Sequence, residues 1–277
     1  MGLATNDFLW VGTHGQVEES LIPRAGLRLE TISGGAIVGV PWRVRLANAA
    51  RLIGSLGKVN RLFSDFRPQA LFMTGGYVNV PVALVAWLRR VPAVIYLPDV
   101  EPGTAIKTLS RFARRVACTT GASEAYFPAG QTVVTGYPVR PDLRAADRVS
   151  QETALARFDL QPGRPTLFVF GGSRGARSVN RALMAALPQL LEQIQIIHVS
   201  GTLDWSEIER QAAGLSAEQR LYYRPYAYLH EEMGLAFRSA DLVLARAGAS
   251  MLGEGPAFGL PAILVPYPYA WRYQKVN

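Results

Sequence analysis

The fold is indicated most clearly by Leu167-Phe-Val-Phe-Gly-Gly-Ser-Arg-Gly-Ala-Arg-Ser-Val-Asn180. An apolar run ends in a glycine-rich turn that opens directly into a helical pattern, which predicts a strand, a tight loop and a helix. Glycines allow close backbone approach, and the free N–H groups at a helix start favour a phosphate. The spacing fits neither the GxGxxG dinucleotide fingerprint nor a P-loop. Turns of this kind also arise for packing reasons alone, so phosphate binding is one of two interpretations.

A second turn of this kind is Leu242-Val-Leu-Ala-Arg-Ala-Gly-Ala-Ser-Met-Leu-Gly-Glu254. A carboxylate about one turn into a helix, here Glu254, can accept two hydrogen bonds from a ribose diol. The alternative is an acidic first-turn residue that the helix dipole stabilises. Two such turns at the carboxyl ends of parallel strands form a crevice that suits a nucleotide.

The first half of the chain contains a similar turn, Leu71-Phe-Met-Thr-Gly-Gly-Tyr-Val-Asn-Val-Pro81. Another expected strand leads into a loop with two carboxylates, Asp99 and Glu101, which either do acid–base chemistry or serve as ordinary turn residues. Arg140 follows a further strand end, where it either clamps an anion or lies on the surface without a ligand.

Short apolar runs alternate with amphipathic stretches along the chain, which predicts α/β architecture with parallel sheets and helices on both faces. The expected strands are 8–11, 70–73, 93–96, 115–119, 131–135, 166–170, 195–200, 221–223, 242–245 and 262–265. The expected helices are 42–66, 80–88, 104–113, 151–157, 178–193, 206–213, 229–240 and 250–258, with a last one beginning near residue 271. A polar stretch with Pro-Gly predicts a linker at 146–165 between domains 1–145 and 166–277, which we expect to face a cleft.

Composition narrows the class of protein. The chain has 277 residues, of which 49% are hydrophobic and 18% charged, and this excludes a disordered chain. A single cysteine and three scattered histidines exclude a disulfide framework and a dedicated His/Cys metal site. A net charge of +8 favours nucleic acid, phosphorylated small molecules or an anionic membrane as partner. Nucleic acid is set aside because no recognition-helix pattern or aromatic-basic interleaving supports it.

Any membrane contact is expected to be peripheral, because no window reaches the ~18–20 apolar residues that a spanning helix needs. The expected helix 42–66 carries an apolar stripe that basic residues flank, which suits a helix lying on one leaflet. The alternative is an amphipathic helix packed on its own sheet.

These motifs, in this order, resemble the undecaprenyl-diphospho-muramoylpentapeptide β-N-acetylglucosaminyltransferases (the MurG family), which are two-domain GT-B glycosyltransferases of bacterial cell-wall synthesis. The matching segments run over nearly the whole chain: Thr74-Gly-Gly-Tyr-Val, Gly136-Tyr-Pro-Val-Arg140, Gly171-Gly-Ser-Arg-Gly-Ala176, Arg246-Ala-Gly-Ala-Ser…Glu254 and Gly259-Leu-Pro-Ala…Pro266. The resemblance implies two Rossmann-like parallel-sheet domains that face a cleft.

The resemblance also implies a UDP-GlcNAc site in the second domain, with Glu254 on the ribose, Ser173 at the diphosphate and the backbone of His230 at the uracil. The residues implied to contact UDP-GlcNAc are Asp99, Arg140, Ser173, His230, Ala249, Ser250, Met251, Leu252, Gly253, Glu254 and Gln274. The implied acceptor-diphosphate loop is Thr74, Gly75, Gly76 and Tyr77, and the implied membrane patch is Leu46, Ala50, Ile53, Leu56 and Trp87.

The activity that the resemblance implies is transfer of GlcNAc, with inversion and without a required metal or cofactor, to lipid I at the cytoplasmic face of the plasma membrane. Asp99 is the one candidate for the general base, and it stands where the family usually has Asn. Tyr273 replaces the common His before Gln274. The alternatives are another glycolipid synthase that uses a UDP-sugar, and a noncatalytic nucleotide-sugar-binding partner.

Both ends of the chain differ from the family pattern. The family opens with a strand and a Gly-Gly-Thr-Gly-Gly-His loop, whereas Gly12-Thr-His-Gly15 follows what aligns as the second strand, so His14 is not assigned the role of that His. The family's C-terminal helices have no counterpart either. We therefore expect a fragment in which both domains are incomplete and stability is marginal.

Overall fold

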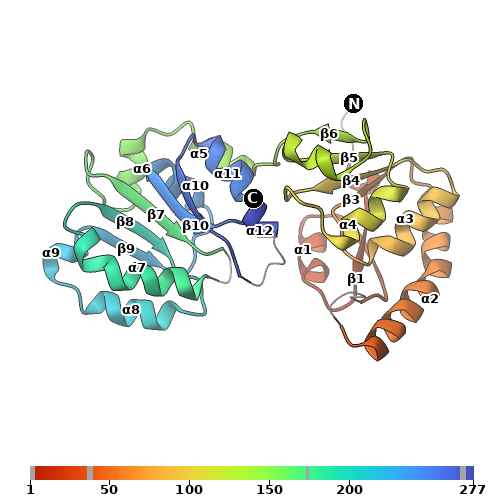
Figure 1. Ribbon diagram of the computed structural model, residues 1–277, viewed down its shortest axis with the longest axis horizontal. Helices are drawn as coiled ribbons and strands as arrows, with labels where there is room; N and C mark the ends of the chain where they lie inside the picture. The colour runs from red at the N-terminus through yellow and green to blue at the C-terminus, as the bar shows by residue number, and fades with distance from the viewer. Residues whose placement is uncertain (1–3, 36–39, 173–174, 269–272) are drawn as a thin grey trace. The chain divides into compact units, whose positions relative to one another are not determined.

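The computed structural model describes residues 4–35, 40–172, 175–268 and 273–277. The chain forms two compact units: Met1–Leu97 with Pro102–Thr135, and Pro98–Glu101 with Gly136–Asn277. Each unit is a parallel α/β structure (Figure 1). The α/β class expected from the sequence is confirmed.

The first unit contains a two-stranded and a four-stranded parallel sheet. β1 (Leu9–Thr13) pairs with β2 (Arg28–Ile32), and the larger sheet has the order β3-β4-β5-β6. Its strands are β3 (Leu71–Met73), β4 (Ala93–Leu97), β5 (Arg115–Cys118) and β6 (Thr132–Val134). The helices are η1 (Thr5–Asp7), α1 (Glu18–Arg24), α2 (Trp42–Phe66), α3 (Asn79–Leu88), α4 (Thr104–Leu109), η2 (Ser110–Phe112) and η3 (Gly121–Tyr126).

Two buried clusters hold the first unit together. In β4 the buried residues alternate with half-buried ones, and Ile95 and Leu97 pack with Leu109 and Val116. The second cluster joins α2 and α3 to β2 through Val59, Phe63 and Ile32 among others. Burial of these apolar side chains is the main force that fixes both helices on the strands.

The second unit is built on a five-stranded parallel sheet of order β11-β10-β7-β8-β9. Its strands are β7 (Thr166–Phe170), β8 (Gln195–Val199), β9 (Tyr223–Tyr226), β10 (Leu242–Arg246) and β11 (Ala262–Val265). All five residues of β7 and of β8 are buried, as expected for strands that are covered on both faces. The helices are α5 (Pro141–Ala146), α6 (Gln151–Arg157), α7 (Arg177–Leu190), α8 (Trp205–Ala213), α9 (Ala217–Arg220), α10 (Met233–Ser239), α11 (Met251–Ala257) and α12 (Tyr273–Val276).

Helices cover both faces of this sheet, and Figure 1 shows α7 and α8 on the face opposite α5, α6 and α10. One core cluster joins Phe168 and Phe170 to Phe237 of α10 and Met251 of α11. The other cluster joins Leu167 and Val169 to α7. Successive residues of β7 therefore contribute to opposite faces, as the period of a strand requires.

The boundary between the units differs from the expected linker. The second unit begins at Gly136, and the segment expected to be a linker at 146–165 is part of its core. Leu143 of α5, Leu155 of α6 and Phe158 are buried in the same cluster as Phe237. The polar residues of this segment lie on its exposed faces together with Ala156, whereas Ala154, Leu155, Phe158 and Leu160 are buried.

Several elements also differ from the sequence-based expectation. The structure adds β2, α1, α5 and α9, which were not expected. The expected helix 104–113 divides into α4 and η2, the expected helix 229–240 begins only at Met233, and the expected strand 221–223 lies later, at Tyr223–Tyr226. Among the described residues, no helix is long and apolar enough to cross a membrane.

Candidate functional site

The glycine-rich turn between β7 and α7 is folded tightly on its own backbone. A side-chain carbon on Gly171 would lie 2.3 Å from the amide nitrogen of Ala176, and Gly175 has a φ of +77°. Gly175 N donates to Gly172 O at 2.9 Å, which closes the turn. Only glycine fits these two positions, because any side chain would collide with the backbone. Ser173, the implied diphosphate residue, lies outside the described residues.

The second turn leads from β10 through residues 247–250 into α11. Glu254 N donates to Ser250 O at 2.8 Å in the first turn of this helix. Burial raises the pKa of the Glu254 carboxyl above its usual range, while the Arg140 guanidinium and a hydrogen bond from the Ser250 side chain oppose that rise. The implied nucleotide residues Ala249, Ser250, Met251, Leu252 and Gly253 lie in this same turn and helix start.

Arg140 lies at the start of α5, near enough to Glu254 for its charge to favour the ionised carboxylate. Its Nη1 also forms an ion pair with Asp142, with a nitrogen–oxygen distance of 3.6 Å. Between the two elements the ring of Tyr137 packs on Gly253, where an added side-chain carbon would lie 2.3 Å from Tyr137 Cβ. The structure thus brings together two residues that the sequence places more than a hundred positions apart.

Arg246 at the end of β10 connects the turn before α7 and the turn before α11 to the loop after β11. Its guanidinium donates to the carbonyls of Val265 at 3.5 Å and Pro266 at 3.3 Å, and it lies over the ring of Tyr267. Gln274 of α12 accepts a hydrogen bond from Tyr267 N at 2.8 Å. Arg246 lies within a motif of the sequence, but no function was predicted for it, because a strand-end arginine has no distinctive spacing.

The other implied contacts are distributed over separate loops. His230 is exposed, and its ring lies 4.6 Å from the ring of Tyr228 between centroids. Asp99 follows β4, in the loop that groups with the second unit, and its Oδ1 accepts a hydrogen bond from Asn277 Nδ2 at 2.8 Å. Asn277 also accepts from Val100 N at 3.0 Å, so this amide holds the loop at two points.

The implied acceptor-diphosphate loop follows β3. Gly75 and Gly76 both have positive φ, of +102° and +86°, so the loop needs glycine at these positions. Asn79 at the start of α3 donates from Nδ2 to Gly75 O and holds the loop against the helix. Asn79 lies within the motif quoted from the sequence, but its role depends on the loop conformation and was not predicted. Thr74 and Tyr77 complete the loop between β3 and α3.

The implied membrane patch is only partly exposed. Leu46, Ala50 and Ile53 share one exposed face of α2, where Leu46 is 61% and Ile53 67% exposed. Leu56 instead packs against the cluster of Val59 and Phe63, because it lies on the side of α2 that faces the sheet. Trp87 of α3 is 57% exposed, and its ring meets the edge of Phe112.

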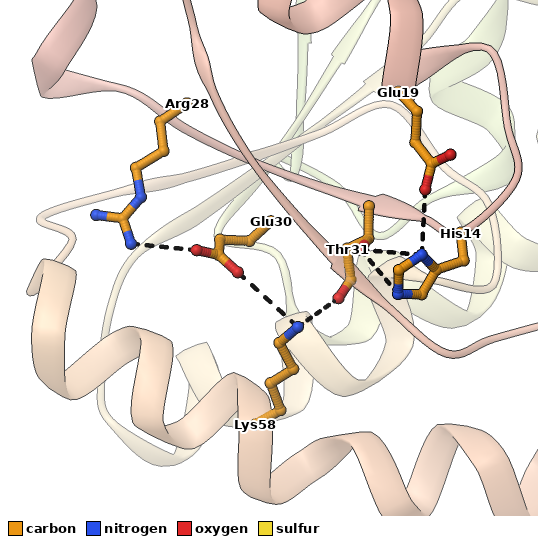
Figure 2. Close-up of polar contacts among 6 residues, drawn as sticks. All are labelled: His14, Glu19, Arg28, Glu30, Thr31 and Lys58. Atoms are coloured by element: carbon orange, nitrogen blue, oxygen red, sulfur yellow. Dashed lines mark hydrogen bonds and ion pairs between the residues drawn. The ribbon is translucent and has the colours of Figure 1, made fainter.

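A polar cluster at β1 and β2 had no distinctive signal in the sequence. Figure 2 shows His14 beside Glu19 of α1 and Thr31 of β2, and the His14 Nδ1–Glu19 Oε1 distance is 3.1 Å. Lys58 of α2 donates to Thr31 O at 2.8 Å and lies 3.8 Å from a Glu30 oxygen. These contacts fasten α2 to the two-stranded sheet.

Comparison with known proteins agrees with this arrangement. Residues 2–118 match the glycosyltransferase family 28 N-terminal domain, and residues 166–277 match the glycosyltransferase family 28 C-terminal domain. A protein of Roseiflexus sp. (strain RS-1) named UDP-N-acetylglucosamine–N-acetylmuramyl-(pentapeptide) pyrophosphoryl-undecaprenol N-acetylglucosamine transferase is 41% identical, over 97% of this chain and 68% of the relative. This chain belongs to the MurG family. A MurG relative of the same name from Thermodesulfovibrio yellowstonii is 35% identical, over 97% of this chain and 72% of its own length.

A solved MurG structure agrees with the family assignment. The crystal structure of Acinetobacter baumannii MurG superposes with a TM-score of 0.70 at 25% identity, covering 97% of this chain and 73% of that one. UDP-GlcNAc 2-epimerase from Neisseria meningitidis, at 9% identity and a TM-score of 0.60, shares the fold alone. The family and the GT-B fold expected from the sequence motifs are thereby confirmed.

Proposed function

We propose that this chain transfers GlcNAc from UDP-GlcNAc to the C4 hydroxyl of MurNAc on undecaprenyl-diphospho-MurNAc-pentapeptide (lipid I), which makes lipid II for peptidoglycan synthesis. The observation that carries the proposal is 41% identity over 97% of the chain to a relative that is named for this transfer. The placement of Arg140 beside Glu254 supports it, because a cation and a carboxylate at a helix start suit a nucleoside diphosphate.

The second unit would bind the donor. The Glu254 carboxylate would accept hydrogen bonds from the ribose, and the turn at residues 171–176 with the start of α7 would bind the diphosphate. The backbone at His230 would bind the uracil, and Arg140 and Gln274 would contact the remainder of the donor. The loop at Thr74 to Tyr77 in the first unit would bind the diphosphate of the acceptor.

The reaction would be a single displacement. The acceptor oxygen attacks the anomeric carbon of GlcNAc, the bond from that carbon to the diphosphate oxygen breaks, and UDP leaves with inversion of configuration. Negative charge develops on the leaving diphosphate, where N–H groups at the start of α7 and the Arg140 guanidinium would stabilise it. A base takes the hydroxyl proton, and Asp99 is the candidate in this chain. No metal is required for this route.

The acceptor is a membrane lipid, so the enzyme would act at the cytoplasmic face of the plasma membrane as a peripheral protein. The exposed apolar residues Leu46, Ala50 and Ile53 of α2, with Arg43, Arg45 and Arg51 nearby in the sequence, suit an anionic leaflet. Trp87 of α3 would add an aromatic anchor at the interface.

Calorimetric titration of the chain with UDP-GlcNAc, UDP-glucose and ADP tests the donor first. We expect selective binding of UDP-GlcNAc, followed by turnover of lipid I with release of UDP. Equal binding of both UDP-sugars would instead favour another glycolipid synthase. Binding without turnover would favour a noncatalytic nucleotide-sugar-binding protein, and no binding by a folded sample would contradict the donor site.

A further inference from the structure

His198 of β8 is buried and hydrogen-bonded at both ring nitrogens. Its Nδ1 lies 2.7 Å from the Tyr223 hydroxyl of β9, and its Nε2 lies 3.1 Å from Asn180 Oδ1 of α7. Burial lowers the pKa of His198 to about 4, so the ring is neutral at physiological pH. The proposed reaction uses none of these three residues.

The contacts of Asn180 fix the position of the hydrogens in this group. Its Nδ2 donates to the Ser200 carbonyl at 2.9 Å and to Asp204 Oδ2 at 2.9 Å. Both partners only accept, so the amide nitrogen must face them and Oδ1 must face His198. His198 therefore carries its hydrogen on Nε2, and its Nδ1 accepts from the hydroxyl of Tyr223.

Asp204 contacts the first turn of α7 at two residues: at Asn180, as described above, and at Arg177. The carboxylate is largely buried, and its Oδ1 accepts a hydrogen bond from Arg177 Nε at 2.8 Å. The Asp204 carbonyl accepts from Ile208 N at 3.1 Å at the start of α8. The first turn of α7 is thus tied through Arg177 and Asn180 to the segment that follows β8.

The segment that follows β8 also packs directly against the glycine-rich turn. A side-chain carbon on Gly175 would lie 2.2 Å from the Ser200 carbonyl oxygen, the atom that accepts from Asn180. Ser200 is itself held by β9, because its backbone N donates to Tyr226 O at 3.0 Å. A change in this hydrogen-bonded group would therefore shift the turn as well as the helix start.

We propose that Asn180, His198 and Asp204 are positioning residues for the nucleotide diphosphate: they hold the Ser200 carbonyl and the first turn of α7, and so fix the amides that bind the ligand. This inference rests on the proposed function. Amides that are held in place before binding lose little conformational entropy when the ligand arrives. Removal of the group should therefore weaken diphosphate binding and leave contacts to the nucleoside unchanged.

The experiment compares UDP with uridine. The Asn180→Asp variant replaces the amide with a carboxylate. The carboxylate cannot donate to the Ser200 carbonyl or to Asp204, so both hydrogen bonds are lost. Calorimetry with UDP should show affinity reduced at least tenfold, whereas NMR titration with uridine should show affinity unchanged within twofold. The matched control is Leu187→Ala, which removes a buried side chain from the same helix but none of the hydrogen bonds of the group. The control should lower the melting temperature but keep the UDP affinity.

The outcomes separate the inference from the proposed function. Failure of the wild type to bind UDP would overturn the proposed function and this inference with it. The positioning role alone would be overturned in two cases, both of which require that the wild type binds UDP. In the first, folded Asn180→Asp keeps the wild-type affinity for UDP; in the second, it loses affinity for UDP and for uridine equally. If Asn180→Asp does not fold, Asp204→Asn and Tyr223→Phe provide the same comparison with smaller changes in shape. An unchanged ratio of UDP affinity to uridine affinity in both of these variants would overturn the positioning role.

Discussion

Arg246 Nη2 at the end of β10 donates to the hydroxyl of Ser178 in the first turn of α7, at a distance of 2.8 Å. The same guanidinium bonds the carbonyls of Val265 and Pro266. One side chain therefore joins the two glycine-containing turns to the loop after β11. The two turns that the sequence presents as separate motifs form one connected structure in the second unit.

Replacing this arginine with lysine should weaken that connection. A lysine ammonium is a single point of charge and cannot bond three oxygens across the width of a guanidinium. We expect Arg246→Lys to lower the free energy of unfolding by about 1 kcal/mol, the usual contribution of one hydrogen bond, as measured by urea denaturation. The matched control Arg210→Lys, at an exposed position on α8, should change it by less than about 0.5 kcal/mol. Equal effects at the two sites would contradict the linking role.

Glu254→Ala should weaken UDP binding by roughly 1–3 kcal/mol, because a charged acceptor of hydrogen bonds is lost. Isothermal titration of the variant against the wild type measures this difference. Glu152→Ala removes an exposed first-turn glutamate from α6 and should leave the affinity unchanged. Unchanged UDP affinity in Glu254→Ala would contradict the assignment of this carboxylate to the ribose.

Gly175→Ala should be far more damaging than Gly163→Ala. Both glycines have positive φ, of +77° and +80°, so each alanine carries a backbone penalty of about 1–2 kcal/mol. Gly163 faces open space, whereas a carbon on Gly175 would lie 2.2 Å from the Ser200 oxygen. We expect an additional loss of roughly 2 kcal/mol or more for Gly175→Ala in urea denaturation. Similar losses of unfolding free energy in both variants would mean that the turn shifts to make room for the added carbon.

Acid should destabilise the second unit through His198. In the folded chain its pKa is lowered by burial from 6.5 to about 4, so between these values only the unfolded chain takes up the proton. Stability is therefore lost as pH falls below 6.5, by about 2 kcal/mol at pH 5. His198→Gln does not titrate and should lose less between pH 7.5 and pH 5 when unfolding free energies are compared. Parallel pH dependence in both proteins would argue against this assignment.

Ile53→Asp should reduce binding to anionic vesicles at least tenfold, because burying an isoleucine in a membrane contributes roughly 1.5–3 kcal/mol and about 1.4 kcal/mol corresponds to a factor of ten. Leu203 offers a matched control, since it is 63% exposed against 67% for Ile53 and lies in the second unit. A vesicle co-sedimentation assay with Leu203→Asp should show wild-type binding. Equal loss in both variants would place the membrane contact elsewhere.

The sequence predicted the elements whose pattern is strong and local. The limits of α2, α6, β7 and β11 agree with expectation, because each has a clear apolar period or a clear stop signal. β2 was missed since Arg28-Leu-Glu-Thr-Ile has two charges and only Ile32 is buried. α1 was missed because it includes Pro23 and has no buried residue to create a period.

The candidate site was predictable only where its residues lie in motifs. Glu254 and Arg140 were singled out as candidates because each follows a strand end that has a recognisable turn, and their role in ligand binding stays a prediction. The group around His198 was not found, since Gln195-Ile-Ile-His-Val has the pattern of an ordinary buried strand. Its hydrogen bonds join residues from α7, β8, β9 and the segment before α8, and only the tertiary fold brings these together.

The location of α5 and α6 has a practical consequence for dissecting the protein. Leu143 and Leu155 of these helices pack on Ala236 and Phe237, so they belong to the core that surrounds β7. A recombinant fragment that begins at Gly136 retains this packing. A fragment that begins at residue 166, where the family domain match starts, would expose Phe237 to solvent and is expected to aggregate on expression.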